Sequence, residues 1–196
     1  MNDILSWLDS LDRALFHFIN GTLANPITDL LMPFFTADLN LKIFYAACLL
    51  LILWKGDARL RWAIIFSLIV VTLTDQLASH VVKPWVGRLR PCHEMTVHLL
   101  VGCGGGKSMP SSHAANLFGQ AAFFWMVYKP SAKYLFSLAV VVALSRVFVG
   151  VHYPGDIVVG AILGIVIGLA LGLVYNKYTH PFLKSRFNRK QSVDAH

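Results

Sequence analysis

The sequence predicts an all-α integral membrane protein, a bundle of five to six transmembrane helices with an N-terminal amphipathic helix. Of its 196 residues, 56% are hydrophobic and only 14% are charged, a composition too apolar for an ordinary soluble domain. The apolar residues gather in segments whose lengths approach the roughly 20 residues that a helix needs to cross a bilayer. Composition and segment length together therefore favour a membrane protein.

A single membrane domain is expected over residues 1–196, with a distinct N-terminal region at 1–37 and a basic tail at 177–196. No repeat, low-complexity segment or long linker divides the chain. Because the N-terminus carries acidic residues and no basic stretch, a cleaved secretory signal is not expected.

Residues 4–19 have the periodicity of an amphipathic helix that lies in the membrane interface, with the charged residues largely on the other face. The next segment, 27–37, is apolar but short and contains Asp29 and Pro33, so we expect a re-entrant or partial span. The apolar face of the first helix consists of Ile4, Leu5, Leu8, Leu11, Leu15, Phe18 and Ile19.

Five stronger spans follow, and a sixth could be assembled from residues 14–36. Each of the five is close to the length that a bilayer requires. They are predicted at about 40–54, 62–82, 114–128, 133–150 and 157–175.

Basic residues recur in loops two spans apart, which places those loops on the cytoplasmic side by the positive-inside rule. The loops 83–113 and 151–156 then face away from the cytoplasm. The basic residues of these outward loops are exceptions to the positive-inside rule unless they belong to a functional site. Since the net charge of +7 comes from short loops and a tail, nucleic-acid binding is not expected. The cytoplasmic set is Lys55, Arg59, Arg61, Lys129, Lys133, Lys177, Lys184, Arg186, Arg189 and Lys190.

Two of the three cysteines, Cys92 and Cys103, share the long outward loop, whereas Cys48 lies in an apolar run. In an oxidising compartment the pair could close a loop of about a dozen residues, which the chain-entropy model values at roughly 3 kcal/mol. A disulfide and two free thiols both remain open at this point.

The first polar cluster, Lys83–Pro91, ends a span and contains three cations. Such cations often only anchor a helix at the interface. The span that leads to them has a polar stripe that must face protein or water, and its Asp75 needs a partner, for which a cation of this cluster or of Ser145–Asp156 is the natural candidate. A structural pair with no role in turnover is the alternative. The stripe is Thr72, Asp75, Gln76, Ser79 and Lys83.

The second cluster, Pro110–His113, precedes an apolar run. It fits a helix N-cap with a proline ahead of it. The same helix start exposes free amides that suit a bound anion, with His113 beside them.

The third cluster is Ser145–Asp156. Arg146 lies inside an apolar run, which is costly unless it is paired or lines a cavity. Asp156 follows His152 by four residues, so it can hold one ring N–H and leave the other nitrogen free to attack. A plain turn and helix cap is the alternative for Pro154 and its neighbours.

Cations, helix amides, two histidines and an orienting aspartate suit phosphoryl transfer without a metal. No carboxylate cluster suggests magnesium or zinc, and no cofactor is expected. The segment Gly102–Ser108 has the look of a P-loop, but Val101 stands where the first glycine belongs and no strand precedes it. A flexible loop over the mouth of the site is expected instead.

The three clusters, in their order, resemble the three motifs of the type 2 phosphatidic acid phosphatase family. The resemblance implies that His152 is the nucleophile, that Asp156 orients it and that His113 protonates the leaving group. It also implies a phosphate-binding set assisted by the amide of Ser112. That set is Lys83, Arg90, Ser111, Ser112 and Arg146.

Ser112 departs from the family, whose second motif usually has glycine there. The added side chain narrows the pocket or contributes a hydroxyl, which affects substrate preference. The short chain and outward site most resemble bacterial undecaprenyl-diphosphate phosphatases, and phosphatidylglycerophosphate phosphatases and lipid A phosphatases or phosphotransferases are rivals. A non-catalytic membrane protein that binds anionic lipid is the alternative from another class. The lipid, the preference for mono- or diphosphate and the oligomeric state stay open.

Overall fold

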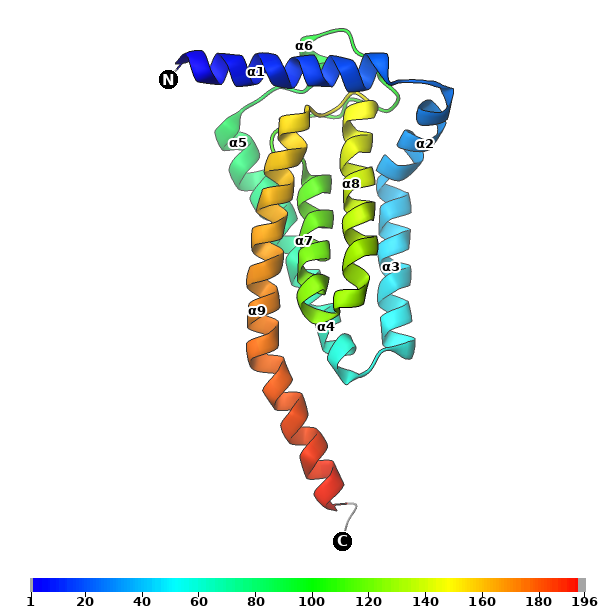
Figure 1. Ribbon diagram of the computed structural model, residues 1–196, viewed down its shortest axis with the longest axis vertical. Coiled ribbons are helices and arrows are strands. Elements are labelled where there is room, and N and C mark those ends of the chain that lie inside the picture. Colours follow the sequence, from blue (N-terminus) through cyan, green and yellow to red (C-terminus); the bar gives the residue numbers. More distant parts are fainter. Residues whose placement is uncertain (1, 194–196) are drawn as a thin grey trace.

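The computed structural model describes residues 2–193, with side chains described for residues 3–179. Every regular element within that range is a helix, so the predicted all-α class is confirmed. Figure 1 shows the long helices running side by side, with α1 lying across one end of the bundle.

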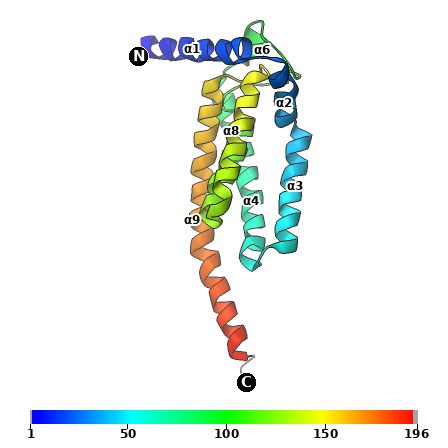
Figure 2. The same ribbon diagram turned by 45° about the vertical axis from the view of Figure 1, so that its right-hand side comes forward.

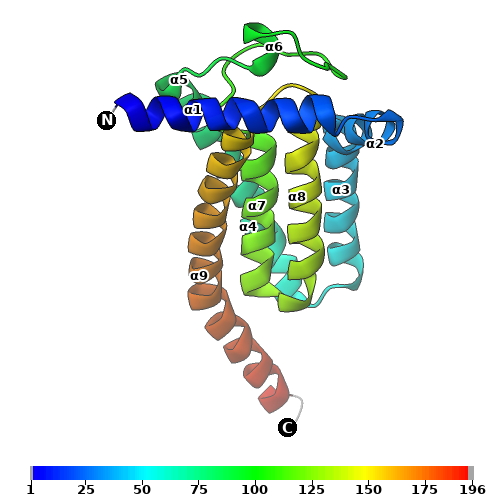
Figure 3. The same ribbon diagram turned by 45° about the horizontal axis from the view of Figure 1, so that its top comes forward.

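Helix α1, Asn2–His17, continues into a π-helix, Phe18–Thr22. Figure 3, tilted to bring the top forward, shows α1 spanning the width of the bundle. Its apolar residues are largely exposed, including Trp7 at 61%, whereas Phe16 is buried against Tyr153. The amphipathic helix predicted over 4–19 is present, with one apolar face turned away from the protein.

Helices α2, Pro26–Thr36, and α3, Asp38–Lys55, form a pair bent by 57° at Ala37. Asn25 caps α2 in a reciprocal capping box, because its side chain accepts from the amide of Thr28 while the Thr28 hydroxyl bonds the Asn25 amide. The predicted partial span corresponds to α2. None of the residues of α3 is buried, so this helix is held loosely along the bundle.

Helix α4, Ala58–Gln76, passes through a π-helical turn, Leu77–Val82, into α5, Lys83–Val86. The helical run then ends at Gly87, whose φ of 69° is the left-handed conformation that glycine adopts at little cost. This end delivers the first polar cluster to the α1 end of the bundle, where the short helix α6, Pro91–Glu94, follows.

The last part of the chain contains α7, Ser112–Val127, α8, Ala132–Phe148, and the long α9, Pro154–Val193, with a short 3₁₀ turn, Lys129–Ser131, before α8. Helix α7 is central, since α4, α8 and α9 all pack on it. Figure 2 shows α8, α9 and α4 from another side, in the same parallel arrangement.

Glycines at every fourth position of α9 allow its backbone to touch α7. A Cβ added at Gly164 would collide with the carbonyl oxygen of Ala115, and one at Gly168 with that of Gly119. This close approach fixes the start of α9 beside the start of α7, and with them the second and third polar clusters. The glycines are Gly160, Gly164, Gly168 and Gly172.

Three helical segments are long and apolar enough to cross a membrane, and the bent α2–α3 pair raises this to as many as four. Helix α7 has 16 residues and falls short of that test. The five predicted spans correspond in place to α3, α4, α7, α8 and α9, and their number across the bilayer stays a prediction. The three qualifying segments are Ala58–Glu94, Lys129–Phe148 and Pro154–Thr179.

The disulfide left open by the sequence is present: Cys92 and Cys103 are bonded, with Cα atoms 6.1 Å apart. It closes the loop beyond α6, at the α1 end of the bundle, as Figure 1 shows. Cys48, within α3, is a free thiol.

Candidate active site

A cavity of about 910 Å³ lies where α3, α4, α5 and α7 meet the loop before α9. Side chains from all three polar clusters line it, so residues up to about 70 positions apart in the sequence share one site. The predicted site residues in its lining are Lys83, Arg90, Ser112, His113, Arg146 and His152.

His152 and Asp156 form the pair that their spacing predicted. The Nδ1 atom of His152 lies 3.3 Å from Oδ2 of Asp156, and that oxygen also accepts the amide of Tyr153 at 2.8 Å. His152 is 2% exposed and Asp156 is fully buried. Because the carboxylate holds Nδ1, the other ring nitrogen of His152 is left for the cavity.

The surroundings of His152 keep its imidazole neutral. Burial lowers the pKa of His152 well below its usual value, and the nearby charges of Arg146, Arg90 and Lys83 act in the same direction. An unprotonated ring nitrogen in a cationic cavity is the form in which histidine attacks phosphorus.

Two guanidinium groups of the cavity carry unused hydrogen-bond donors. The Nε atoms of Arg90 and Arg146 are buried and have no partner among the described residues. Arg146 also donates from Nη1 to the hydroxyl of Thr36, at 2.6 Å. A buried donor without an acceptor is costly, so these groups suit a bound anion.

The start of α7 contributes further donors. The Ser111 hydroxyl is buried and accepts the amide of Ala114 at 3.5 Å, which is an N-cap contact. Ser112 points into the cavity, where its hydroxyl accepts from Nζ of Lys83 at 2.7 Å and lies 3.1 Å from that of Ser79. The side chain that replaces the family glycine therefore holds the lysine in the cavity.

His113 is paired with a residue that the sequence analysis did not select. Its Nε2 lies 2.9 Å from Oδ1 of Asp38, at the start of α3. Asp38 and Thr36 flank the bend between α2 and α3, and each bonds a predicted site residue. The interrupted apolar pattern before Asp38 predicted a broken span, but nothing in the sequence predicted that the break would reach the site.

The expectation that a cation pairs with Asp75 is wrong for the part of the chain that the structure describes. There, no basic group lies within 4.0 Å of its carboxylate. Asp75 is one of the residues that line the cavity. An ionisable residue within a span needs a polar environment, and for Asp75 the cavity provides it in place of an ion-pair partner.

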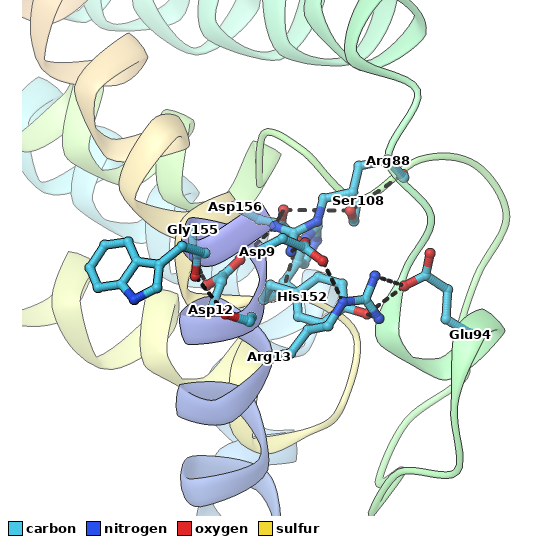
Figure 4. Close-up of polar contacts among 12 residues, drawn as sticks. Asp9, Asp12, Arg13, Arg88, Glu94, Ser108, His152, Gly155 and Asp156 are labelled. Carbon is cyan, nitrogen blue, oxygen red and sulfur yellow. Dashed lines mark hydrogen bonds and ion pairs between the residues drawn. The ribbon is translucent and has the colours of Figure 1, made fainter. Parts of the chain in front are cut away.

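Arg88 differs from the other cations of its cluster. Figure 4 shows it beside Asp156. Its Nη1 lies 3.1 Å from Oδ1 of Asp156 and 2.6 Å from Oδ2 of Asp12, which belongs to α1. Arg88 is absent from the cavity lining, unlike Lys83 and Arg90, the two residues of this cluster that the family resemblance assigned to phosphate binding.

The glycine-rich loop that resembles a P-loop lies at the cavity. Val101, Gly102, Cys103 and Gly104 are among the lining residues, as expected of a loop over the mouth of the site. The disulfide ties this loop to α6.

A cationic cavity beside a buried His–Asp pair, at one end of a bundle of apolar helices, is the arrangement expected of a membrane phosphatase. The model of the PAP2 superfamily matches residues 61–180. The chain therefore belongs to the PAP2 superfamily, and the family and enzyme class predicted from the three motifs are confirmed.

Two relatives and one solved structure show the range of similarity. The chain is 34% identical to a lipid A 4'-phosphatase of Bacteroides thetaiotaomicron over 82% of this chain and 75% of that protein. It is 26% identical to the putative undecaprenyl-diphosphatase YbjG of Escherichia coli, over 88% and 87%. The crystal structure of Aquifex aeolicus LpxE has the same fold, with a TM-score of 0.64, 24% identity, and coverage of 86% and 96%.

Proposed function

We propose that this protein removes phosphate from a membrane lipid without a metal, through a phosphohistidine formed on His152. The observation that supports this most is the cavity in which the free ring nitrogen of His152 shares space with the unpartnered Nε donors of Arg90 and Arg146. Nucleophile and cationic side chains then lie around one cavity, as phosphoryl transfer requires.

In the first half-reaction, Nε2 of His152 attacks phosphorus and the bond from phosphorus to the lipid oxygen breaks. His113 gives its proton to that oxygen. The Asp156 carboxylate accepts a hydrogen bond from Nδ1–H and stabilises the positive charge that develops on the ring. Arg90, Arg146 and the amides at the start of α7 stabilise the negative charge on the phosphoryl oxygens.

In the second half-reaction, a water molecule attacks the phosphohistidine while His113 takes its proton. The nitrogen–phosphorus bond breaks, its electron pair returns to His152, and inorganic phosphate leaves. Both histidines return to their starting protonation states, so no further reactant is needed.

For the substrate, we favour a phosphate monoester on a glycolipid headgroup of the lipid A type. Polar groups continue down the cavity, where the Tyr45 hydroxyl lies 2.8 Å from Ser67 Oγ, which donates to Gln120 at 2.7 Å. Hydroxyls and amides suit a sugar ring, whereas a polyprenyl chain is apolar from the diphosphate onward. The 34% identity to a lipid A 4'-phosphatase supports the same choice. The polar lining below the site is Asp38, Lys42, Tyr45, Thr72, Asp75, Gln76, Asn116 and Gln120.

Undecaprenyl diphosphate is the second candidate. The similarity to the putative undecaprenyl-diphosphatase of Escherichia coli supports it, because that match covers 88% of this chain and 87% of the other. The preference for undecaprenyl diphosphate drawn from the sequence stays a prediction.

The proposed location is a cytoplasmic membrane with the site facing outward. The basic turn that joins α3 to α4 lies at the end of the bundle opposite α1, as Figure 1 shows, and so does the turn between α7 and α8. The positive-inside rule puts that end in the cytoplasm. The Cys92–Cys103 disulfide, at the other end, fits an oxidising compartment.

Single cysteines test this orientation. In a Cys48→Ala background, Asp57→Cys and Ser131→Cys are expected to resist a membrane-impermeant thiol reagent in intact cells and to react after lysis. Gly105→Cys, in the outward loop, is expected to react without lysis. Labelling of the first two from outside would invert the proposed topology.

Phosphate release by the purified protein in excess EDTA tests the proposed function. The substrates are lipid A, undecaprenyl diphosphate, phosphatidylglycerophosphate and phosphatidic acid, and the control is His152→Ala. Turnover that survives the chelator and is lost in the variant is expected, with lipid A the best substrate. Failure to release phosphate from any of the four, or equal rates in the variant, would favour the non-catalytic lipid-binding alternative.

A further inference from the structure

Arg88 joins the catalytic aspartate to the interfacial helix α1. Its side chain is 14% exposed and contacts three carboxylates. Nη1 lies 2.6 Å from Asp12 and 3.1 Å from Asp156, and Nη2 lies 3.0 Å from Asp9 (Figure 4). Two of these carboxylates belong to α1, more than 70 residues away in sequence from Arg88.

Asp12 makes a second contact with the catalytic segment. While Oδ2 faces Arg88, Oδ1 accepts the amide of Gly155 at 2.7 Å (Figure 4). Gly155 lies between His152 and Asp156 in sequence and opens α9. One carboxylate of α1 therefore holds both the backbone of the catalytic turn and the cation beside Asp156.

No bulkier residue fits at Gly155 without disturbing this contact. A Cβ there would lie 2.8 Å from Oδ2 of Asp12, closer than side chains pack. The absence of a side chain lets α1 approach the catalytic turn directly.

The residue after the nucleophile is held from the same side. The guanidinium of Arg88 lies 3.9 Å from the centre of the buried Tyr153 ring. The Tyr153 hydroxyl donates to Glu94 at 2.7 Å, and Arg13 of α1 lies 2.8 Å from the same carboxylate. The family motifs assign no role to any of the side chains that make these contacts.

The segment after α1 holds the other flank of the turn. The buried side chain of Asn20 donates to the carbonyl oxygens of Phe148 and His98, both at 2.8 Å, and accepts the His98 amide at 2.9 Å. The end of α8 and the loop beyond α6 are thereby tied to the N-terminal region.

The opposite face of α1 is apolar and exposed, with Ile4 at 66% and Leu8 at 48%. In a membrane protein this face suits the lipid interface. The match to the superfamily begins at residue 61, so α1 lies outside it. A membrane-surface helix beyond the matched segment thus contributes charged contacts to the centre of the site.

We propose that Asp12 and Arg88 are positioning residues: through them, α1 holds Asp156 and the Gly155 turn in the geometry that aims His152 at phosphorus. The proposal rests on the proposed function, because it assigns His152 as the nucleophile. Neither residue touches the phosphate. Their loss is therefore expected to slow the chemical step and to leave substrate binding intact.

The test uses the full chain, purified in detergent and assayed with lipid A in excess EDTA. The variants are Asp12→Asn, Arg88→Gln and the double variant, with Asp3→Asn as a matched control, because Asp3 lies on the same helix and makes no ion pair among the described residues. We expect kcat to fall about 10- to 100-fold in each single variant, since small misplacements of reacting groups have effects of that order. KM is expected to change by less than about two-fold.

The double variant is expected to be no slower than the slower single variant, because both substitutions break one connection. Arg88→Lys keeps the positive charge but lacks the two-pronged guanidinium, so its kcat is expected to lie between those of Arg88→Gln and the wild type. Thermal unfolding midpoints are measured beside the rates. Asp12→Asn keeps an oxygen for the Gly155 amide, so it is the variant expected to fold with an unchanged midpoint.

Unchanged kcat in both single variants would overturn the proposal while wild-type turnover upheld the proposed function. Losses of kcat that add up in the double variant, or that appear only together with a raised KM and a lowered unfolding midpoint, would reduce both residues to structural ones and overturn it too. Wild-type protein that releases no phosphate would instead overturn the proposed function and this proposal with it.

Discussion

The two walls of the phosphate cavity are built differently. On one side, glycines of α9 bring its backbone against α7, and the buried pair His152–Asp156 stands at the end of that contact. On the other, the bent pair of α2 and α3 reaches the cavity with Thr36 and Asp38, and α3 buries none of its residues. The wall of α7 and α9, which holds His152, is closely packed and is called the fixed wall, whereas the wall of α2 and α3 buries few residues and is called the loosely held wall.

The largest effect is expected where the two walls meet, at His113. His113→Asn removes the proton donor and is expected to slow hydrolysis of lipid A by about 10²- to 10⁴-fold. A leaving group that needs no proton bypasses this defect in the first half-reaction, so the control is the first-turnover burst of p-nitrophenol from p-nitrophenyl phosphate, which precedes the water step in which His113 also acts. An equal loss in that burst and in lipid A turnover would remove His113 from the role of acid.

The next effect concerns the fixed wall. Gly164→Ala places a methyl group against the Ala115 carbonyl and is expected to destabilise the protein by about 1–3 kcal/mol, seen as a lower thermal unfolding midpoint together with reduced kcat. The matched control is Gly21→Ala, because a Cβ at Gly21 meets no atom within 4 Å. If both variants behave alike, the tight contact of α7 and α9 does not set the site.

A pH profile of the activity tests the environment of His152 in the fixed wall. The pKa of His152 is lowered by burial and by nearby Arg146, Arg90, Lys83 and His113, while Asp156 is its one carboxylate neighbour within hydrogen-bond distance. The neutral ring is the nucleophile, so activity is lost as pH falls through this pKa, and the acid limb is expected below pH ~6.5, the ordinary value for histidine.

Arg146→Gln removes one of these charges, and the acid limb of kcat/KM is expected to move to higher pH by up to about one unit, whatever the loss in rate. The profile is measured with p-nitrophenyl phosphate. Because this substrate ionises identically in both assays, a difference in the acid limb between wild type and variant comes from the enzyme. A limb at or above pH ~6.5 in the wild type, or one that the variant moves downward, would contradict the environment assigned to His152.

The smallest effect is expected on the loosely held wall. Asp38→Asn keeps a hydrogen-bond acceptor for His113 and is expected to change kcat/KM only about two- to ten-fold, with lipid A affected more than phosphatidic acid. Its side chain is 71% exposed, unlike that of Asp156. A loss as large as that of His113→Asn would show that this wall is as fixed as the other.

Much of the fold and site could be predicted because the information is local. Apolar length predicted the helices, and a histidine four residues before an aspartate at a helix start predicted the His152–Asp156 contact. The six predicted residues that line the cavity stand at or near helix ends, which loop charge had placed on one side of the membrane.

The rest depends on contacts between distant segments. Arg88 and Arg90 are two residues apart and chemically alike, yet one faces Asp12 and Asp156 and the other lines the cavity. The separation of 76 residues between Arg88 and Asp12 gives no local pattern to detect. The prediction for Asp75 failed for a related reason. The sequence predicted an ion pair with a cation, but Asp75 lines a polar cavity formed by distant segments.

The most direct test of the central claim is to trap the covalent intermediate. Purified protein is mixed with 32P-labelled lipid A in EDTA, quenched in alkali within the first turnover, and digested to locate the label. We predict alkali-stable, acid-labile phosphate on the peptide that contains His152, and none in His152→Ala. Phosphate released at the wild-type rate with no labelled protein, or label on another residue, would contradict nucleophilic catalysis by His152.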